Sequence, residues 1–300
     1  MKTTLQALLD SGKPIIADGA MGTMLFALGL EQGASPELWN VEHPEKVRSV
    51  HRDYIQAGAQ IVLTNTFGGN RLRLALHDLA DRAAELNQAA AQLARIEADA
   101  APHPVVVAGS MGPTGGVLQP YGELAFDEAA AAFEEQARAL VEGGVDVLWI
   151  ETMSDLEEVR AAVEGARRAA PDFPLVTTMT FDTHGRTMMG VTPEQAVATL
   201  SAFDVLALGG NCGNGPDEIE AVITRMHAAS PQAMLVAKAN AGIPRLEGGV
   251  PVYDATPEAM ASYAQKLRNE GARIIGACCG STPEHIRAIA RVLHGEPSDA

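Results

Sequence analysis

Eight short apolar runs recur along the chain and constrain its fold more strongly than any other feature. They begin near residues 14, 60, 104, 146, 174, 204, 233 and 272, and three of them read "PVVVAGS", "DVLWIET" and "ARIIGACCG". Each run is nearly continuous in apolar residues instead of alternating with polar ones. Because a strand that is covered on both faces has this pattern, the runs predict the strands of a buried parallel sheet.

The stretches between the runs are rich in Ala, Glu and Arg and have helical spacing. Several open on Thr-Pro-Glu, as in "TPEQAVATL", "TPEAMASYAQKL" and "TPEHIRAIARVL". Thr caps the free amide groups of a first turn, and Pro is favoured at the first helical position. These stretches therefore predict helices, and the N-terminal "MKTTLQALLD" predicts one more.

A strand followed by a helix, eight times in 300 residues, predicts an α/β fold that is a single (β/α)8 TIM barrel. We expect residues 1–300 to form one domain, since no linker or low-complexity segment interrupts the pattern. The alternative is a doubly wound open sheet. Such a sheet usually has a Gly-x-Gly-x-x-Gly turn after its first strand, where this chain has "DGAMGTML".

The charge of the chain limits its partners. Its net charge of −16 argues against nucleic acid and against an anionic membrane, because either would attract a basic patch. No apolar run reaches the roughly 18 residues of a membrane span, and the N-terminus does not resemble a signal peptide. Three cysteines without an export signal lead us to expect a cytoplasmic protein in a reducing compartment.

Polar residues and cysteines end most of the predicted strands. In chain order these ends are Asp18-Gly19-Ala20, Thr64-Asn65-Thr66, Glu151-Thr152, Asn211-Cys212-Gly213, Lys238-Ala239-Asn240 and Cys278-Cys279-Gly280. The loops that follow the strands of a (β/α)8 barrel form its active-site mouth. We therefore expect all of these residues at one end of the barrel.

The three cysteines lie in two similar segments, "GGNCG" and "GACCG". The interval between Cys212 and Cys278 covers about two strand–helix units, so the thiols can meet. Three thiolates suit Zn²⁺, which in catalytic sites keeps its fourth position open. The alternatives are three buried thiols that act as small apolar residues, a redox pair, which adjacent cysteines favour less than Cys-x-x-Cys, and a metal-free barrel that binds phosphate at the helix after "CCGSTPEH".

The carboxylates Asp18 and Glu151 are suited to a cationic group such as an amine, or else to capping loop amides. The segment "TFGGNR" either cradles an anion or forms a turn. The residues alone leave both pairs of alternatives open.

Read in order, "DGAMGT", "TNTF", "ET", "GGNCG" and "GACCG" resemble the homocysteine S-methyltransferase family over about residues 13 to 293. The resemblance implies a zinc-dependent barrel that methylates the thiol of L-homocysteine to give L-methionine. It also implies that Cys212, Cys278 and Cys279 bind zinc, and that Asn240 is an exchangeable fourth ligand. No catalytic group is implied beyond the zinc-bound substrate thiolate. The groups implied to hold homocysteine are Asp18 and Glu151 for its amino group, and Gly19, Ala20 and Thr66 for its carboxylate.

The methyl donor differs between branches of the family. The betaine branch boxes its donor with aromatic residues, where this chain has Gly69 and Thr152, and its long C-terminal arm has no counterpart in the sequence. The segments "TNTFGGNR" and "NAG" are more similar to the homocysteine domain of cobalamin-dependent methionine synthase. This implies a stand-alone homocysteine module served by a separate methylcobalamin-carrying protein. Betaine and S-methylmethionine are the alternative donors, and a non-enzymatic zinc- or homocysteine-binding barrel is the alternative of another class.

Overall fold

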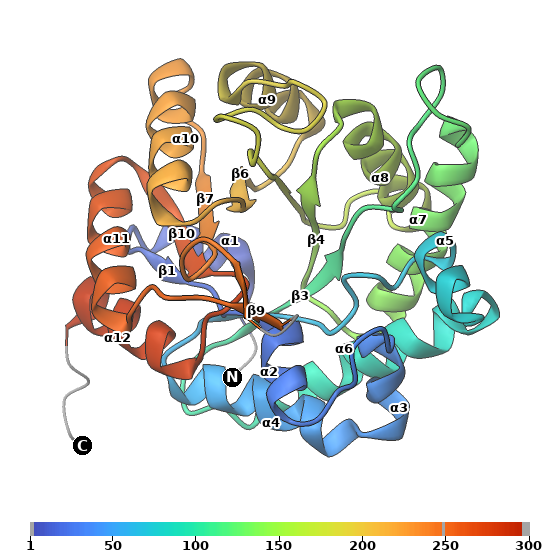
Figure 1. Cartoon of the computed structure of the whole chain (residues 1–300), viewed down its shortest axis with the longest axis horizontal. Helices are drawn as coiled ribbons and strands as arrows, with labels where there is room; N and C mark the ends of the chain where they lie inside the picture. Colours follow the sequence, from blue (N-terminus) through green and yellow to red (C-terminus); the bar gives the residue numbers. More distant parts are fainter. Residues whose placement is uncertain (1–2, 248–249, 296–300) are drawn as a thin grey trace.

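The computed structural model describes residues 3–247 and 250–295, and its centre is a ring of eight parallel strands (Figure 1). Their order is β1-β10-β7-β6-β5-β4-β3-β2. The ring closes between β1 and β2, where Ala17 pairs with Ile61 and the Asp18 N–H donates to the Ile61 carbonyl over 3.0 Å. This closure confirms the predicted (β/α)8 barrel and excludes the open sheet.

All eight predicted apolar runs form strands of the ring. The strands are β1 (Ile15–Ile16), β2 (Ile61–Leu63), β3 (Val106–Met111), β4 (Val147–Met153), β5 (Leu175–Met179), β6 (Ala207–Cys212), β7 (Leu235–Ala239) and β10 (Ala272–Ala277). An antiparallel hairpin of β8 (Arg245–Glu247) and β9 (Val250–Val252), which the sequence analysis did not predict, follows β7.

Helices alternate with the strands and surround the ring (Figure 1). The longer ones are α4 (Pro44–Gln56), α6 (Ala83–Asp99), α7 (Phe126–Gly143), α8 (Leu156–Ala169), α9 (Pro193–Leu200), α10 (Pro216–Ala229), α11 (Pro257–Asn269) and α12 (Pro283–His294). The shorter ones are α1 (Leu5–Asp10), α2 (Met21–Ala27), α3 (Trp39–Glu42) and α5 (Arg71–Leu74). As predicted, α9, α11 and α12 begin with Pro directly after a Thr N-cap.

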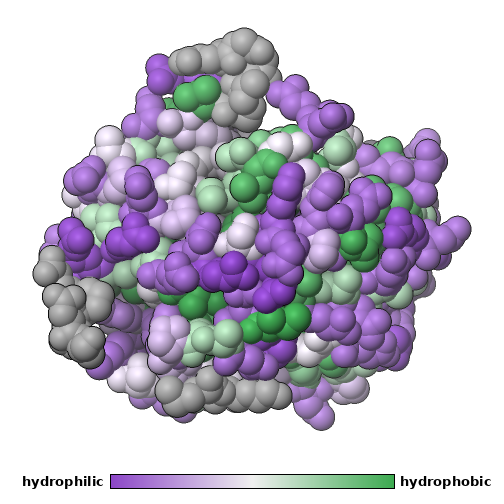
Figure 2. Space-filling view, turned by 90° about the horizontal axis from the view of Figure 1, so that it is seen from below, coloured by the Kyte–Doolittle hydropathy of each residue, from purple (hydrophilic) through white to green (hydrophobic). Residues whose placement is uncertain are grey.

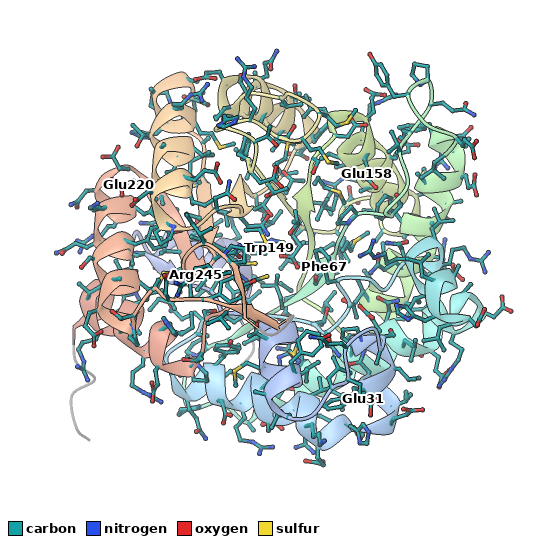
Figure 3. All side chains as sticks on the ribbon, in the orientation of Figure 1. Glu31, Phe67, Trp149, Glu158, Glu220 and Arg245 are labelled. Atoms are coloured by element: carbon teal, nitrogen blue, oxygen red, sulfur yellow. The ribbon has the colours of Figure 1, made fainter. Side chains whose placement is uncertain are left out.

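The barrel interior is apolar where the strands begin. Leu5 and Leu9 of α1 pack in one cluster with inward-facing side chains such as Val106, Val147 and Val236. Trp149 of β4 is fully buried inside the ring (Figure 3). Because this end is filled, only the opposite end, where the strands finish, is available for polar chemistry.

The outside of the barrel is mainly polar. On the side where Figure 1 places α4, hydrophilic residues cover most of the surface and hydrophobic ones form small groups between them (Figure 2). In the part of the chain that the structure describes, no helix has the length and apolar character required to cross a membrane.

Candidate functional site

The three cysteines meet at the mouth of the barrel. Cys212 ends β6, Cys278 and Cys279 follow β10, and only β7 separates these two strands in the ring. The Cys212 sulfur lies 3.7 Å from the Cys278 sulfur and 3.9 Å from the Cys279 sulfur. Two sulfurs on a tetrahedral Zn²⁺, each bonded at about 2.3 Å, lie about 3.8 Å apart. The spacing and the donor type therefore fit a zinc ion.

The sulfur cluster stands alone in the described chain. It is the one group of three or more His, Cys, Asp or Glu side chains, within residues 3–247 and 250–295, whose ligand atoms all lie within 4.8 Å of one another. Hydrogen bonds from the other two thiols lower the pKa of Cys279, whereas the same contacts raise the pKa of Cys212. The contacts between the sulfurs therefore favour ionisation at Cys279 over ionisation at Cys212.

Asn240, which follows β7, ties the two cysteine-bearing loops together. Its side-chain oxygen accepts a hydrogen bond from the Cys279 N–H over 3.0 Å, and its side-chain nitrogen donates to the Gly213 carbonyl over 2.7 Å. The structure thus places this residue beside the sulfur cluster, with its amide engaged by backbone on both sides. Its role as an exchangeable metal ligand stays a prediction.

Asp18 forms an ion pair beneath the sulfur cluster. The Lys238 ammonium lies 2.7 Å from one Asp18 oxygen, and both side chains are 3% exposed. The other Asp18 oxygen accepts the Leu63 N–H over 2.7 Å. Burial raises the pKa of Asp18, and the Lys238 charge opposes that rise. Both oxygens of this carboxylate therefore already have partners within the protein.

Glu151, at the end of β4, is the second buried carboxylate of the mouth. It accepts a hydrogen bond from the Ser110 hydroxyl of β3. Burial raises the pKa of Glu151 to about 7, against the lowering effect of the Lys238 charge. The sequence analysis assigned no role to Lys238 or Ser110. The signal for Lys238 was available, because a lysine in the apolar run "AMLVAKAN" must lie inside the barrel or break the pattern.

The groups expected to hold a substrate carboxylate also lie at this end. The Ala20 N–H donates to the Ser281 hydroxyl over 3.0 Å, and a Cβ atom on Gly19 would overlap the same hydroxyl oxygen. The Thr66 hydroxyl donates to the Ser110 carbonyl over 2.7 Å. These donors are therefore internally bonded in the structure. Their substrate-binding roles stay predictions.

The loop of residues 240–254 reaches the sulfur cluster. Tyr253 lies beside the Cys279 thiol, and its ring packs where a Cβ atom on Gly280 would stand. Residues 248–249 lie outside the described residues. The described part of this loop thus contacts the candidate site.

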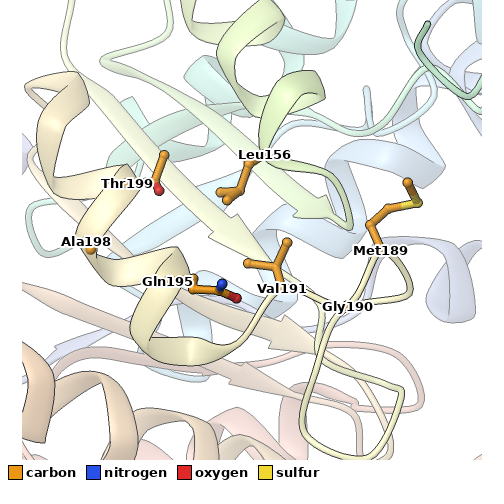
Figure 4. Close-up of a pocket in the computed structure, with 7 residues that line it drawn as sticks. All are labelled: Leu156, Met189, Gly190, Val191, Gln195, Ala198 and Thr199. Carbon is orange, nitrogen blue, oxygen red and sulfur yellow. The ribbon is translucent and has the colours of Figure 1, made fainter. Parts of the chain in front are cut away.

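One groove on the outside of the barrel carries less chemistry than the mouth. This groove, of about 460 Å³, lies beside the N-terminal end of α8 and along α9 (Figure 4). It is lined by Leu156, Met189, Gly190, Val191, Gln195, Ala198 and Thr199. None of these side chains is ionisable. The mouth, in contrast, brings together three thiols and two buried carboxylates, and we therefore take it as the candidate active site.

Comparison with known proteins agrees with this choice. A family model described as homocysteine S-methyltransferase matches residues 15–293. Methionine synthase of Mycobacterium tuberculosis is 34% identical over 305 residues, which cover 95% of this chain and 25% of that protein. The Mycobacterium leprae enzyme of the same name is 34% identical over 296 residues, covering 93% and 24%. The chain thus spans about a quarter of the length of these curated relatives.

Solved structures give the same result for the fold. The metallated form of the homocysteine methyltransferase MmuM from Escherichia coli has a TM-score of 0.81 and 28% identity, covering 95% of this chain and 98% of that one. The apo form of MmuM has a TM-score of 0.73 and 27% identity, covering 96% and 99%. The similarity therefore extends over the whole barrel.

Proposed function

The chain belongs to the homocysteine S-methyltransferase family, and from that premise we propose that it methylates the thiol of L-homocysteine to give L-methionine at a zinc site formed by Cys212, Cys278 and Cys279. The observation that carries the proposal is the convergence of the three sulfurs at the mouth of the barrel. The similarity to a methyltransferase solved in a metallated form supports it.

The proposed metal addresses the weak acidity of the substrate. A free thiol with a pKa of about 8.5 is only a few per cent thiolate at neutral pH. Zn²⁺, when bound, supplies the positive charge that removes the proton of a coordinating thiol. The protein contributes three cysteine ligands, and Asn240 holds their two loops in register. It also orients the substrate for attack on the methyl group, which is the larger part of its task.

Glu151 is the group best placed for the substrate amino group. Lys238 neutralises the charge of Asp18, and both Asp18 oxygens are already bonded. Glu151 is therefore the carboxylate left to match a single ammonium, and binding that ammonium favours its ionised form. In this proposal Asp18 holds Lys238 in place at the mouth. Gly19, Ala20 and Thr66 remain the proposed binding site for the substrate carboxylate.

We propose a methylcobalamin-carrying protein as the methyl donor. The support is that the relatives named methionine synthase are about four times as long as the part this chain matches, so other domains of those proteins have further tasks. A small free donor such as betaine or S-methylmethionine is the second candidate. It is favoured by the similarity to MmuM, of which the chain covers 98%.

An assay of the purified protein with each donor tests the proposal. Elemental analysis of reduced protein should find about one zinc per chain, as expected for one three-sulfur site. Homocysteine should then give methionine with methylcobalamin on a carrier protein, and not with betaine or S-methylmethionine. Methionine formed from a small donor alone would select the second candidate. Zinc-free reduced protein that still makes methionine would contradict the metal site.

A further inference from the structure

Asn211, the residue before Cys212, connects the sulfur cluster to the part of β4 that carries Glu151. Its side chain is fully buried and turns toward β4 and β5. The side-chain oxygen accepts the Thr152 N–H over 2.9 Å and the Thr178 hydroxyl over 2.7 Å. The side-chain nitrogen donates to the Thr152 hydroxyl over 2.7 Å. One amide thus holds the residue after Glu151 at two points.

The residue that Asn211 holds is in an unfavourable conformation. Thr152 has a φ of +62°, which is rare for a β-branched residue. The pairing of β4 with β5 also shifts between Ile150 and Met153, so this stretch leaves the regular ladder. Such a conformation persists only where surrounding contacts fix it. The two bonds with Asn211 are those contacts, and they fix the backbone of β4 at the residue that follows Glu151.

The other neighbour of Asn211 is also left-handed. Cys212 has a φ of +66°. The buried amide of Asn211 therefore joins two residues with constrained backbones. One is Thr152, which directly follows Glu151, the candidate partner of the substrate ammonium. The other is Cys212, which carries one of the three sulfurs of the cluster. This arrangement restrains the distance from Glu151 to the Cys212 sulfur.

We propose that Asn211 is a positioning residue that sets this length and thereby selects homocysteine over shorter thiol amino acids. The inference rests on the proposed function. Homocysteine and cysteine carry the same amino and carboxylate groups and differ by one methylene between these groups and the sulfur. A rigid site distinguishes one methylene by roughly 10- to 200-fold. A site whose ammonium partner moves loses that discrimination while it keeps its metal.

Calorimetric titration of the zinc-loaded full chain with L-homocysteine and with L-cysteine tests the inference. The wild type should bind homocysteine at least about 10-fold more tightly. Asn211→Ala should reduce that ratio to within about threefold, mainly by weakening homocysteine, and it is titrated at a zinc concentration that keeps its three cysteines loaded. An unchanged ratio in folded, zinc-loaded Asn211→Ala would overturn the inference.

Thr178→Val is the matched control. It removes the hydrogen bond that the Thr178 hydroxyl donates to the Asn211 oxygen but leaves both contacts with Thr152. Its ratio should stay at the wild-type value, whereas a ratio that falls as far as in Asn211→Ala would show general loosening and reject the specific role.

If Asn211→Ala does not fold, Thr152→Gly replaces it. This variant loses the hydroxyl contact and lets the backbone leave its held conformation. It should therefore reduce the ratio in the same direction, and an unchanged ratio would overturn the inference. Methyl transfer is not needed for these measurements. A wild type that selects homocysteine yet forms no methionine would contradict the proposed function alone, and one that binds neither thiol would contradict both.

Discussion

The loops after β6 and β10 have similar sequences, "GGNCG" and "GACCG", yet they present their sulfurs by different means. In the first loop the left-handed residues are Cys212 itself and Gly213, with φ values of +66° and +72°. In the second the left-handed residue is Gly280, with a φ of +80°, after both cysteines. The first loop therefore depends on contacts that hold a strained side-chain-bearing residue, and the second depends on a glycine that needs space.

The largest expected effect comes from removing a sulfur of the strained loop. Cys212→Ser should lose zinc and at least 100-fold of the activity, since loss of an outer partner alone typically costs 10- to 100-fold. Zinc content and methionine formation measure this. Cys279→Ser, in the other loop, is the matched variant and should be equally damaging. If Cys212→Ser kept its zinc, the β6 loop would not contribute a ligand and the comparison would fail.

The glycine-dependent loop is probed by Gly280→Ala. The added Cβ atom would overlap the Tyr253 ring, at a position whose φ already disfavours a side chain. We expect zinc affinity to fall roughly 10- to 100-fold, measured by competition with a chelator, because Tyr253 and the cysteine loop must move apart.

Gly144→Ala is the control for that variant. Gly144 has a φ of +97° but nothing within 4 Å of its added Cβ atom, so the change costs only the conformational penalty, about 1 kcal/mol. It should leave zinc affinity unchanged. If both variants lost zinc equally, the loss would reflect general destabilisation and not the Tyr253 contact.

Asn240→Ala sharpens the comparison by removing a side chain that bonds to the backbone of both loops. It frees the Cys279 N–H and the Gly213 carbonyl, and we expect zinc to bind about 10-fold less tightly. Asn87→Ala, which removes a buried amide bonded to Gly69 and Ala83 on the other side of the barrel, is the control. It should lower the melting temperature without changing zinc affinity. Equal zinc affinity in wild type and Asn240→Ala would show that the loops are held independently.

The sequence predicted the frame of this site better than its contacts. Eight apolar runs predicted eight strands, and the closed barrel brings β6 and β10 close enough for Cys212 and Cys278 to meet. The Asp18–Lys238 pair joins residues 220 positions apart, and its formation depends on the register at which the ring closes. Local pattern carries no information about that register. The left-handed conformations of Thr152 and Cys212 were equally hidden, because neither position holds a glycine.

Glu151→Gln gives the smallest expected effect. It tests the environment of Glu151, beside the left-handed Thr152, through the pH dependence of stability. Burial raises the pKa of Glu151 to about 7, so between about pH 4.5 and 7 the folded protein holds a proton that the unfolded chain has released. Stability of the wild type therefore falls as pH rises through this window, by at most about 1.4 kcal/mol per pH unit, the limit for one proton. Gln can still accept from Ser110, and the variant should lose this part of the slope in urea unfolding at several pH values.

Glu158→Gln separates that slope from recognition of the substrate. Burial also raises the pKa of Glu158, whose carboxylate accepts hydrogen bonds from the N–H and the hydroxyl of Thr114. This residue lies outside the sulfur cluster and makes no contact that the proposed substrate site uses. Both variants should flatten the pH dependence in the same direction, but only Glu151→Gln should weaken homocysteine binding. If Glu151→Gln left homocysteine binding unchanged, the substrate ammonium would have another partner. The hydrogen bonds of Asn211 would then serve to hold Cys212 for the metal alone.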